Sequence, residues 1–248
     1  MNKRKAGIMI NEIPFGNFPV LFRQCGLDFF ILDDEHGGFD YREIYNIINA
    51  SRLIGGIECI VRIPSNERRD ITKFMDMGAD SLLLPMTSRS EDIRKVVQYA
   101  KYAPIGERGI STMRAHTLYA PPPLLQYMES ANARTKVYAQ IETAEGVENI
   151  DEILSVEGVA GFLMGPNDLS ASYGCLGNDR AEEILKAIEK TTASAKKIGK
   201  ISGIITGNAA YLTKAKECGM QMFSKGSELS LLAEGIRRTV SSLCEEKV

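Results

Sequence analysis

Residues 29–63 read FFILDDEHGGFDYREIYNIINASRLIGGIECIVRI and contain the repeating unit of the fold. The runs FFILD (29–33) and ECIVRI (58–63) are short, apolar and partly β-branched, as buried strands are. The segment between them has helical periodicity and ends at a glycine suited to a helix C-terminal cap. We expect its apolar face to carry Ile44, Ile47, Ile48 and Leu53. The stretch therefore predicts two parallel strands joined by a helix.

The same alternation runs along the whole chain. Eight strand candidates, each followed by a helix-like segment, lie at residues 6–10, 29–33, 58–63, 81–86, 136–142, 161–165, 201–205 and 220–225. Eight such units predict an α/β protein with a single (β/α)8 TIM barrel over residues 1–248. An open doubly wound sheet is the alternative, but no Gly-x-Gly-x-x-Gly follows the first strand to support its dinucleotide-binding form.

Composition limits the classes of partner and compartment. The 248 residues carry a net charge of −2 with dispersed basic residues, so we expect neither a nucleic acid nor an anionic membrane as partner. The five cysteines are widely separated and form no Cys-x-x-Cys pair, which argues against a zinc site and a disulfide framework. The amino-terminal apolar run is too short for a signal peptide. A cytoplasmic protein is expected.

Polar side chains gather where the predicted strands end. Asp33, Glu35 and His36 follow the second strand, and Arg62 ends the third. In a barrel, the carboxyl ends of all strands converge on one mouth, where active sites are built. A histidine there can act as a base near neutral pH, and an arginine can hold a developing oxyanion.

The fifth and sixth strands bring oxygen ligands to the same mouth. Gln140 and Glu142 end the fifth strand, and Asp168 follows the sixth. Two carboxylates from adjacent strands suit a hard divalent cation that keeps open positions for substrate. Each group alone also has a structural explanation, since Asp168 can cap a helix beginning at Leu169 and Arg62 can pair with a neighbouring acid. The joint pattern favours a functional site.

These motifs resemble the HpcH/HpaI family of class II, metal-dependent 2-keto acid aldolases. The matching stretches follow the family order along nearly the whole chain: DDEHG (33–37), VRIP (61–64), MDMGADSLLLPM (75–86), YAPIGERG (102–109), QIETAEGVENIDEI (140–153), GVAGFLMGPNDLS (158–170) and GKISGI (199–204). The resemblance implies a carbon–carbon lyase that cleaves or forms a 4-hydroxy-2-keto acid through a pyruvate enolate. It also implies a homo-oligomer, often a hexamer, with an exchanged C-terminal helix.

The resemblance further implies roles for single residues. Glu142 and Asp168 match the metal ligands, typically for Mg²⁺, Mn²⁺ or Co²⁺. Arg62 matches the arginine that stabilises the enolate, and His36 the acid–base histidine. Asp76 matches an aspartate that raises the basicity of the histidine, although its place near a helix end should lie far from its own barrel mouth. The remaining substrate-contacting positions are Asp33, Gln140, Asn167 through its backbone, and Ile205.

Other readings of the same scaffold stay open. The segment 110–123 departs from the family around His116, which is either a surface loop histidine or a residue that reshapes the site for another electrophile. A condensing relative, such as a siderophore-pathway citrate synthase that uses oxaloacetate and acetyl-CoA, is the main alternative. A Schiff-base aldolase would need a reactive lysine, with Lys225 or Lys136 as candidates. A non-catalytic metabolite-binding barrel is the fourth reading.

Overall fold

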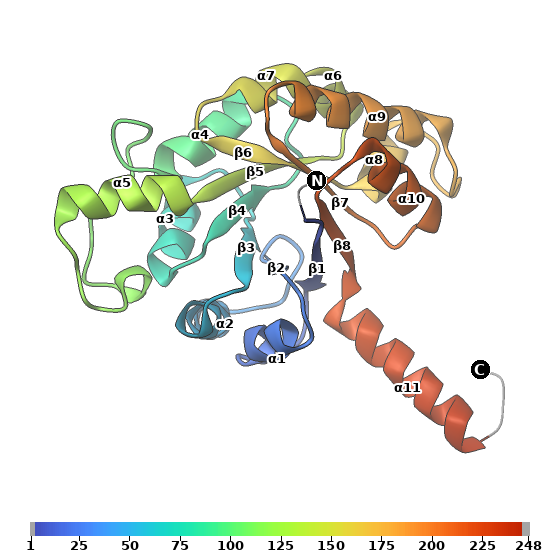
Figure 1. The fold of residues 1–248 in the computed structure, drawn as a ribbon, viewed down its shortest axis with the longest axis horizontal. Coiled ribbons are helices and arrows are strands. Elements are labelled where there is room, and N and C mark those ends of the chain that lie inside the picture. The colour runs from blue at the N-terminus through green and yellow to red at the C-terminus, as the bar shows by residue number, and fades with distance from the viewer. Residues whose placement is uncertain (1–2, 245–248) are drawn as a thin grey trace.

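The computed structural model describes residues 3–244 and contains a closed barrel of eight parallel strands in sequence order (Figure 1). The strands are β1 (Lys5–Ile10), β2 (Phe29–Asp33), β3 (Glu58–Arg62), β4 (Ser81–Leu84), β5 (Lys136–Ile141), β6 (Val159–Met164), β7 (Ile201–Ile205) and β8 (Met222–Ser227). β8 pairs with β1 and closes the cylinder. The expected (β/α)8 barrel is confirmed, and the open sheet is wrong.

All the described helices except the last surround the barrel on its outer face (Figure 1). The helices are α1 (Phe18–Gln24), α2 (Tyr41–Ile54), α3 (Arg68–Met77), α4 (Ser90–Ala100), α5 (Leu124–Arg134), α6 (Ala144–Glu148), α7 (Ile150–Ser155), α8 (Pro166–Ser172), α9 (Glu182–Lys197), α10 (Ala209–Cys218) and α11 (Glu228–Cys244), with a short 3₁₀ turn, η1 (Ala115–Thr117). Within residues 3–244, no helix is long and apolar enough to cross a membrane.

The alternation of side chains along each strand positions the site. Phe29 and Ile31 of β2 and Ile60 of β3 pack together inside the barrel. Because a strand directs every second side chain to the same face, Asp33 and Arg62 also point inward, at the carboxyl ends of their strands. These two residues are direct partners in the β2–β3 register.

The opposite end of the barrel is closed by a polar network around Glu58. Its carboxylate accepts hydrogen bonds from Ser81 Oγ at 2.7 Å and Tyr138 OH at 3.2 Å. Lys136 Nζ lies 2.8 Å and Lys5 Nζ 3.2 Å from Glu58 Oε2. Lys136 is therefore neutralised at the end remote from the strand carboxyl ends, where it does not fit the role of a Schiff-base lysine.

Some details differ from the sequence expectations, and the eighth strand, expected at 220–225, lies at Met222–Ser227. Leu53 is 65% exposed, whereas Ile44, Ile47 and Ile48 are fully buried. Leu53 lies nine positions after Ile44, which is half a turn away at about 100° per residue, so it faces solvent. The fourth strand ends at Leu84 rather than at Met86, because Met86 adopts a positive φ of 49° in the turn that follows.

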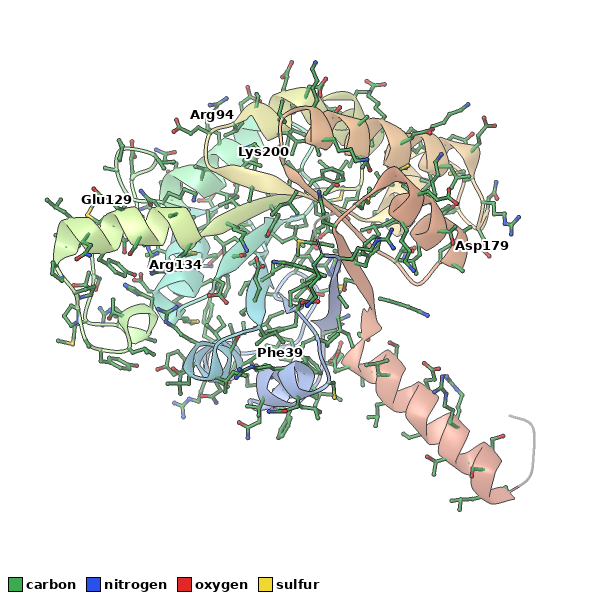
Figure 2. All side chains as sticks on the ribbon, viewed as in Figure 1. Phe39, Arg94, Glu129, Arg134, Asp179 and Lys200 are labelled. Atoms are coloured by element: carbon green, nitrogen blue, oxygen red, sulfur yellow. The ribbon has the colours of Figure 1, made fainter. Side chains whose placement is uncertain are left out.

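The C-terminal helix α11 extends away from the body of the barrel (Figure 1). Figure 2 shows its side chains standing clear of the other helices along most of its length. The exposed apolar residues on it are Leu229, Leu231, Leu232, Ile236, Val240 and Leu243. Its first residue, Glu228, is buried and accepts hydrogen bonds from the backbone N–H groups of residues 11–13, which ties β8 to the end of β1.

Candidate active site

A buried ion pair between Arg62 and Asp33 forms the base of the site. Arg62 Nε donates to Asp33 Oδ1 at 2.8 Å, and Nη2 donates to Oδ2 at 2.6 Å. Burial lowers the pKa of Arg62, but the hydrogen bonds and charge of Asp33, together with the charge of Glu35, raise it above its ordinary value. The guanidinium is therefore a fixed positive charge with a defined plane.

Glu35 also belongs to the site, although the sequence analysis gave it no role. Its Oε2 lies 3.2 Å from Arg62 Nη1 and 3.7 Å from His36 Nε2. The turn is shaped by Asp33, whose Oδ1 accepts the backbone N–H of Glu35 at 3.1 Å. The His36 side chain is 71% exposed and so stands free at the mouth. Its place in the acidic run directly after β2 put Glu35 at the mouth, but no residue pattern indicated its contacts.

Glu142 is the buried carboxylate of the site. It is 2% exposed, accepts the backbone N–H of Met86 at 2.7 Å through Oε1, and accepts the Gln140 side-chain amide through Oε2. Burial raises its pKa; the charges of Asp168 and Glu35 push in the same direction, against the hydrogen bonds from Met86 and Gln140. Among the described residues, no basic side chain is hydrogen-bonded to Glu142. Its carboxylate lies near the like charges of Asp168 and Glu35 as well as the positive charge of Arg62, an arrangement that suits a bound cation.

The remaining expected residues lie at the ends of β6 and β7. Asp168 and Asn167 are exposed in the first turn of α8, and Ile205 is half-buried at the end of β7. Burial is the main cause that raises the pKa of Glu35, and the charge of Asp168 adds to it. Asp168 therefore lies close enough to Glu35 to interact with it. Hydrogen bonds, ion pairs and charge interactions therefore join Asp33, His36, Arg62, Gln140, Glu142 and Asp168 in one group. Asn167 and Ile205 lie at neighbouring strand ends, and Asp76 lies elsewhere.

Asp76 lies in α3 and does not join this group. Its Oδ1 accepts a hydrogen bond from Arg108 Nη2 at 2.9 Å and lies 3.8 Å from His116 Nδ1. Among the described residues, no polar contact links it to His36. Within one chain, α3 and the Arg108 contact hold Asp76 apart from His36, as expected from its place near the helix end.

His116 is not a surface residue of the loop. It is 4% exposed, packs its ring against Tyr127 with centroids 5.6 Å apart, and contacts Asp76. The reading as a surface loop histidine is wrong, because η1 folds the loop onto α3 and α5. Lys225 is exposed, whereas its neighbour Ser224 is buried, so Lys225 does not serve the barrel interior.

The donor atoms at the mouth fit a hard divalent cation with few protein ligands. Within residues 3–244, no three His, Cys, Asp or Glu side chains form a ready metal cluster. Glu142 and Asp168 supply two carboxylates, and the buried Oε1 of Gln140 has no hydrogen-bond partner. Gly165 leaves room beside them, since a Cβ there would come within 2.5 Å of Glu142 Oε2. Two carboxylates with free positions match the Mg²⁺-like pattern.

Comparisons with known proteins agree with this geometry. The profile of the HpcH/HpaI aldolase/citrate lyase family matches residues 20–234. A 5-keto-4-deoxy-D-glucarate aldolase from Escherichia fergusonii is 32% identical over 97% of this chain and 96% of its own. Other relatives that match over most of their length are also named aldolases.

Solved structures show the same likeness. An HpcH/HpaI aldolase from Desulfitobacterium hafniense superposes with a TM-score of 0.92 at 30% identity, over 99% of this chain and 94% of that one. The citrate synthase SbnG superposes with a TM-score of 0.86 at 27% identity, over 98% and 94%. The expectation of a carbon–carbon lyase is confirmed at the level of the family. The chain belongs to the HpcH/HpaI aldolase/citrate lyase family.

Proposed function

We propose that the protein is a metal-dependent aldolase that cleaves or forms the carbon–carbon bond of a 4-hydroxy-2-keto acid through a pyruvate enolate. One observation carries this proposal. Two carboxylates, Glu142 and Asp168, lie beside the fixed charge of Arg62 at the carboxyl ends of the barrel strands. This arrangement combines a cation site with an oxyanion site, which is what enolate chemistry requires.

Glu142 and Asp168 would hold the cation, for which Mg²⁺, Mn²⁺ and Co²⁺ all suit carboxylate ligands. Gln140, whose Oε1 has no partner, lies within hydrogen-bond reach of Glu142 and can orient it or contact substrate. When bound, the cation supplies Lewis-acid stabilisation to a chelated 2-keto acid. Gly165, by its lack of a side chain, keeps this part of the mouth open.

Arg62 stabilises the charge of the enolate. Its Nε and Nη2 are engaged by Asp33, which fixes the guanidinium plane before substrate arrives. Such a preorganised donor gains strength in a site screened from water, and loss of one typically costs on the order of a hundredfold in rate. Asp33 therefore acts through Arg62 and through the turn that carries Glu35 and His36.

His36 moves the proton of the 4-hydroxyl group. In the cleavage direction it takes this proton as the carbon–carbon bond breaks, and in the synthetic direction it returns it. Its side chain stands at the mouth with Glu35 3.7 Å away, so it can reach a substrate held against Arg62. Asn167 and Ile205, on the β6 and β7 side of the mouth, would contact the same substrate.

The protein is also proposed to be a homo-oligomer, as a hexamer or a dimer-based assembly. The support is α11, which leaves six apolar side chains exposed away from its own barrel, five of them on one face of the helix: Leu229, Leu232, Ile236, Val240 and Leu243. A second copy is the natural cover for such a face. In such an assembly, Asp76, on the outer face of α3, could serve the mouth of a neighbouring copy. A cytoplasmic location agrees with the five free cysteines.

A condensing enzyme on the same scaffold is the second candidate. It is favoured by the likeness to the citrate synthase SbnG. The cation and Arg62 could equally hold oxaloacetate, a 2-keto acid, while an acetyl-CoA-derived carbanion attacks. Turnover of oxaloacetate with acetyl-CoA, in place of pyruvate enolisation, would identify this activity.

The deciding experiment is metal-dependent exchange of the pyruvate methyl protons in D₂O, followed by NMR on metal-stripped and reloaded protein. We expect exchange with Mg²⁺, Mn²⁺ or Co²⁺, and its loss in Glu142→Gln. Glu157→Gln, which alters an exposed acid of the same type, is the matched control and should exchange like wild type. Absence of exchange with every metal would refute the pyruvate aldolase and move the question to oxaloacetate.

A further inference from the structure

Glu228 is a buried carboxylate that the proposed aldolase mechanism does not use. It is the first residue of α11 and directly follows β8, which lies beside β1 in the barrel (Figure 1). The residue is 4% exposed, and the hydrogen bonds that its carboxylate accepts come from backbone N–H groups rather than from basic side chains. Burial of a charge is costly unless hydrogen bonds compensate it, so these partners explain why the carboxylate lies here.

The N–H groups of three consecutive residues converge on this carboxylate. Oε1 of Glu228 accepts the N–H of Asn11 at 3.0 Å, and Oε2 accepts the same N–H at 3.1 Å. Oε1 also accepts the N–H groups of Glu12 at 2.6 Å and Ile13 at 3.0 Å. Successive backbone N–H groups that point to one centre form a nest, which is a concave anion site. The chain therefore fills this nest with its own anion, from a residue 217 positions after Asn11.

The segment that Glu228 holds lies against the turn that carries His36. Gly37 follows His36 and lies between two backbone oxygens. A Cβ added to Gly37 would come within 2.0 Å of the Asp33 oxygen and 3.0 Å of the Asn11 oxygen. Only glycine fits at such a close approach, so the backbone of Asn11 packs directly on the turn. Because of this contact, a displacement of residues 11–13 is passed on to the turn.

The position of the His36 ring depends on the backbone of its turn. The side chain is 71% exposed, and its Nε2 lies 3.7 Å from Glu35 Oε2. The backbone N–H of His36 donates to Asp33 Oδ1 over a long 3.4 Å. These contacts are weak, so the ring is placed mainly by the backbone of residues 33–37. The segment at residues 11–13 supports that backbone from one side.

We propose that Glu228 is a positioning residue for His36, acting through the backbone of residues 11–13. The proposal rests on the function proposed above, in which His36 moves the proton of the 4-hydroxyl group. Proton transfer needs the ring within hydrogen-bond reach of that group, and a misplacement of about 1 Å costs on the order of a hundredfold in rate. A carboxylate that only joined β8 to β1 would make a different prediction, since its loss would lower stability without a specific change at His36.

The first test empties the nest and refills it. Glu228→Ala removes the carboxylate and leaves room for a small anion, so formate should bind to the three N–H groups. When sodium formate replaces sodium chloride at constant ionic strength, the melting temperature of Glu228→Ala should rise by about 3–5 °C once formate reaches ten times its Kd. Wild type, whose nest is filled, should show no saturating rise. The same absence of a rise in Glu228→Ala would overturn the assignment of residues 11–13 as an anion nest.

The second test reads the position of His36 directly, because the chain has only two histidines, His36 and His116. In untagged protein labelled with ¹³C at histidine Cε1, NMR should give two imidazole signals, and His36→Gln identifies the one from His36. We expect Glu228→Ala to shift the His36 signal and not the His116 signal, and formate to return it to its wild-type position. These signals report position rather than turnover, so their outcome is separate from that of the pyruvate exchange experiment.

Two further variants separate positioning from a general loss of stability. Glu234→Ala is the matched control, because Glu234 is an exposed acid of the same helix that pairs with Arg238. It should leave both histidine signals unchanged and give no formate response. Glu228→Asp, whose carboxylate is one methylene shorter, should shift the His36 signal by less, and it decides the question if Glu228→Ala fails to fold. An unchanged His36 signal, equal shifts of both histidines, or a shift that formate does not reverse would each overturn the proposal.

Discussion

The strongest prediction concerns Gly165, the residue that leaves room for the proposed cation. In Gly165→Ala, the added Cβ would lie 2.5 Å from Glu142 Oε2 and 3.2 Å from Gln140 Nε2, whereas ordinary contact begins at 3.4 Å. The carboxylate must therefore move by about 0.9 Å. It cannot simply rotate away, because Oε1 is held by the Met86 backbone and Oε2 by Gln140. A displacement near 1 Å typically costs about a hundredfold in rate.

We expect Gly165→Ala to fold, to bind Mn²⁺ about 10–100-fold more weakly by calorimetry, and to exchange the pyruvate methyl protons about a hundredfold more slowly. Gly16→Ala is the control, since its Cβ would meet only Asn46 at an ordinary 3.5 Å. Wild-type metal affinity and exchange in Gly165→Ala would refute the assignment of Glu142 as a ligand. Equal losses in both variants would mean that general destabilisation, not the site, is responsible.

Three further predictions follow from the charged groups. Arg62→Lys should lower methyl exchange by about a hundredfold while the protein stays folded, because a lysine cannot make two parallel bonds to Asp33. Glu58→Gln should lower the free energy of unfolding by about 3 kcal/mol in urea titrations. Burial raises the pKa of Glu58, but the charge and hydrogen bond of Lys136 lower it by more, so the pKa lies below its ordinary value. The stabilisation from this carboxylate is therefore present above about pH 4.5 and is lost as the pH falls through the folded pKa. Burial first, and then neighbouring acids, raise the pKa of Asp34 to about 6, so its ionisation destabilises the fold as the pH rises from about 4 through 6. Asp34→Asn should raise the melting temperature at pH 8 but not at pH 4, by an amount equivalent to about 1–2 kcal/mol for this half-buried group, and equal effects at both pH values would contradict this.

The barrel itself could be predicted because it rests on local signals. Each strand is a short apolar run followed by a segment with helical periodicity. Eight such units in succession are typical of a sheet that closes into a barrel. The same regularity predicted much of the site. Residues two apart on a strand share a face, so the inward side chains at the strand carboxyl ends, such as Arg62 and Gln140, could be named before their contacts were seen.

Backbone geometry at the strand ends was not predictable in the same way. Met86 was expected to continue a strand, yet it turns into a positive φ and offers its N–H to Glu142. The involvement of Glu35 depends on how the turn after β2 wraps around Asp33, which residue types alone do not determine. Both contacts shape the candidate site without contributing any distinctive sequence pattern.

Tertiary packing limits what the sequence can say about Asp76 and His116. Asp76 is contacted by Arg108 of the long loop, and His116 by Arg52 of α2 and Tyr127 of α5, so these contacts join segments that no local sequence pattern links. A histidine in a polar, proline-rich loop has no local feature that distinguishes exposure from burial. It is buried because the loop folds back over Gly78 and sets the His116 ring on Tyr127, which becomes visible only when three helices are assembled. Because Arg108 and His116 both belong to this loop, a change that releases the loop from α3 should remove both of their contacts with Asp76.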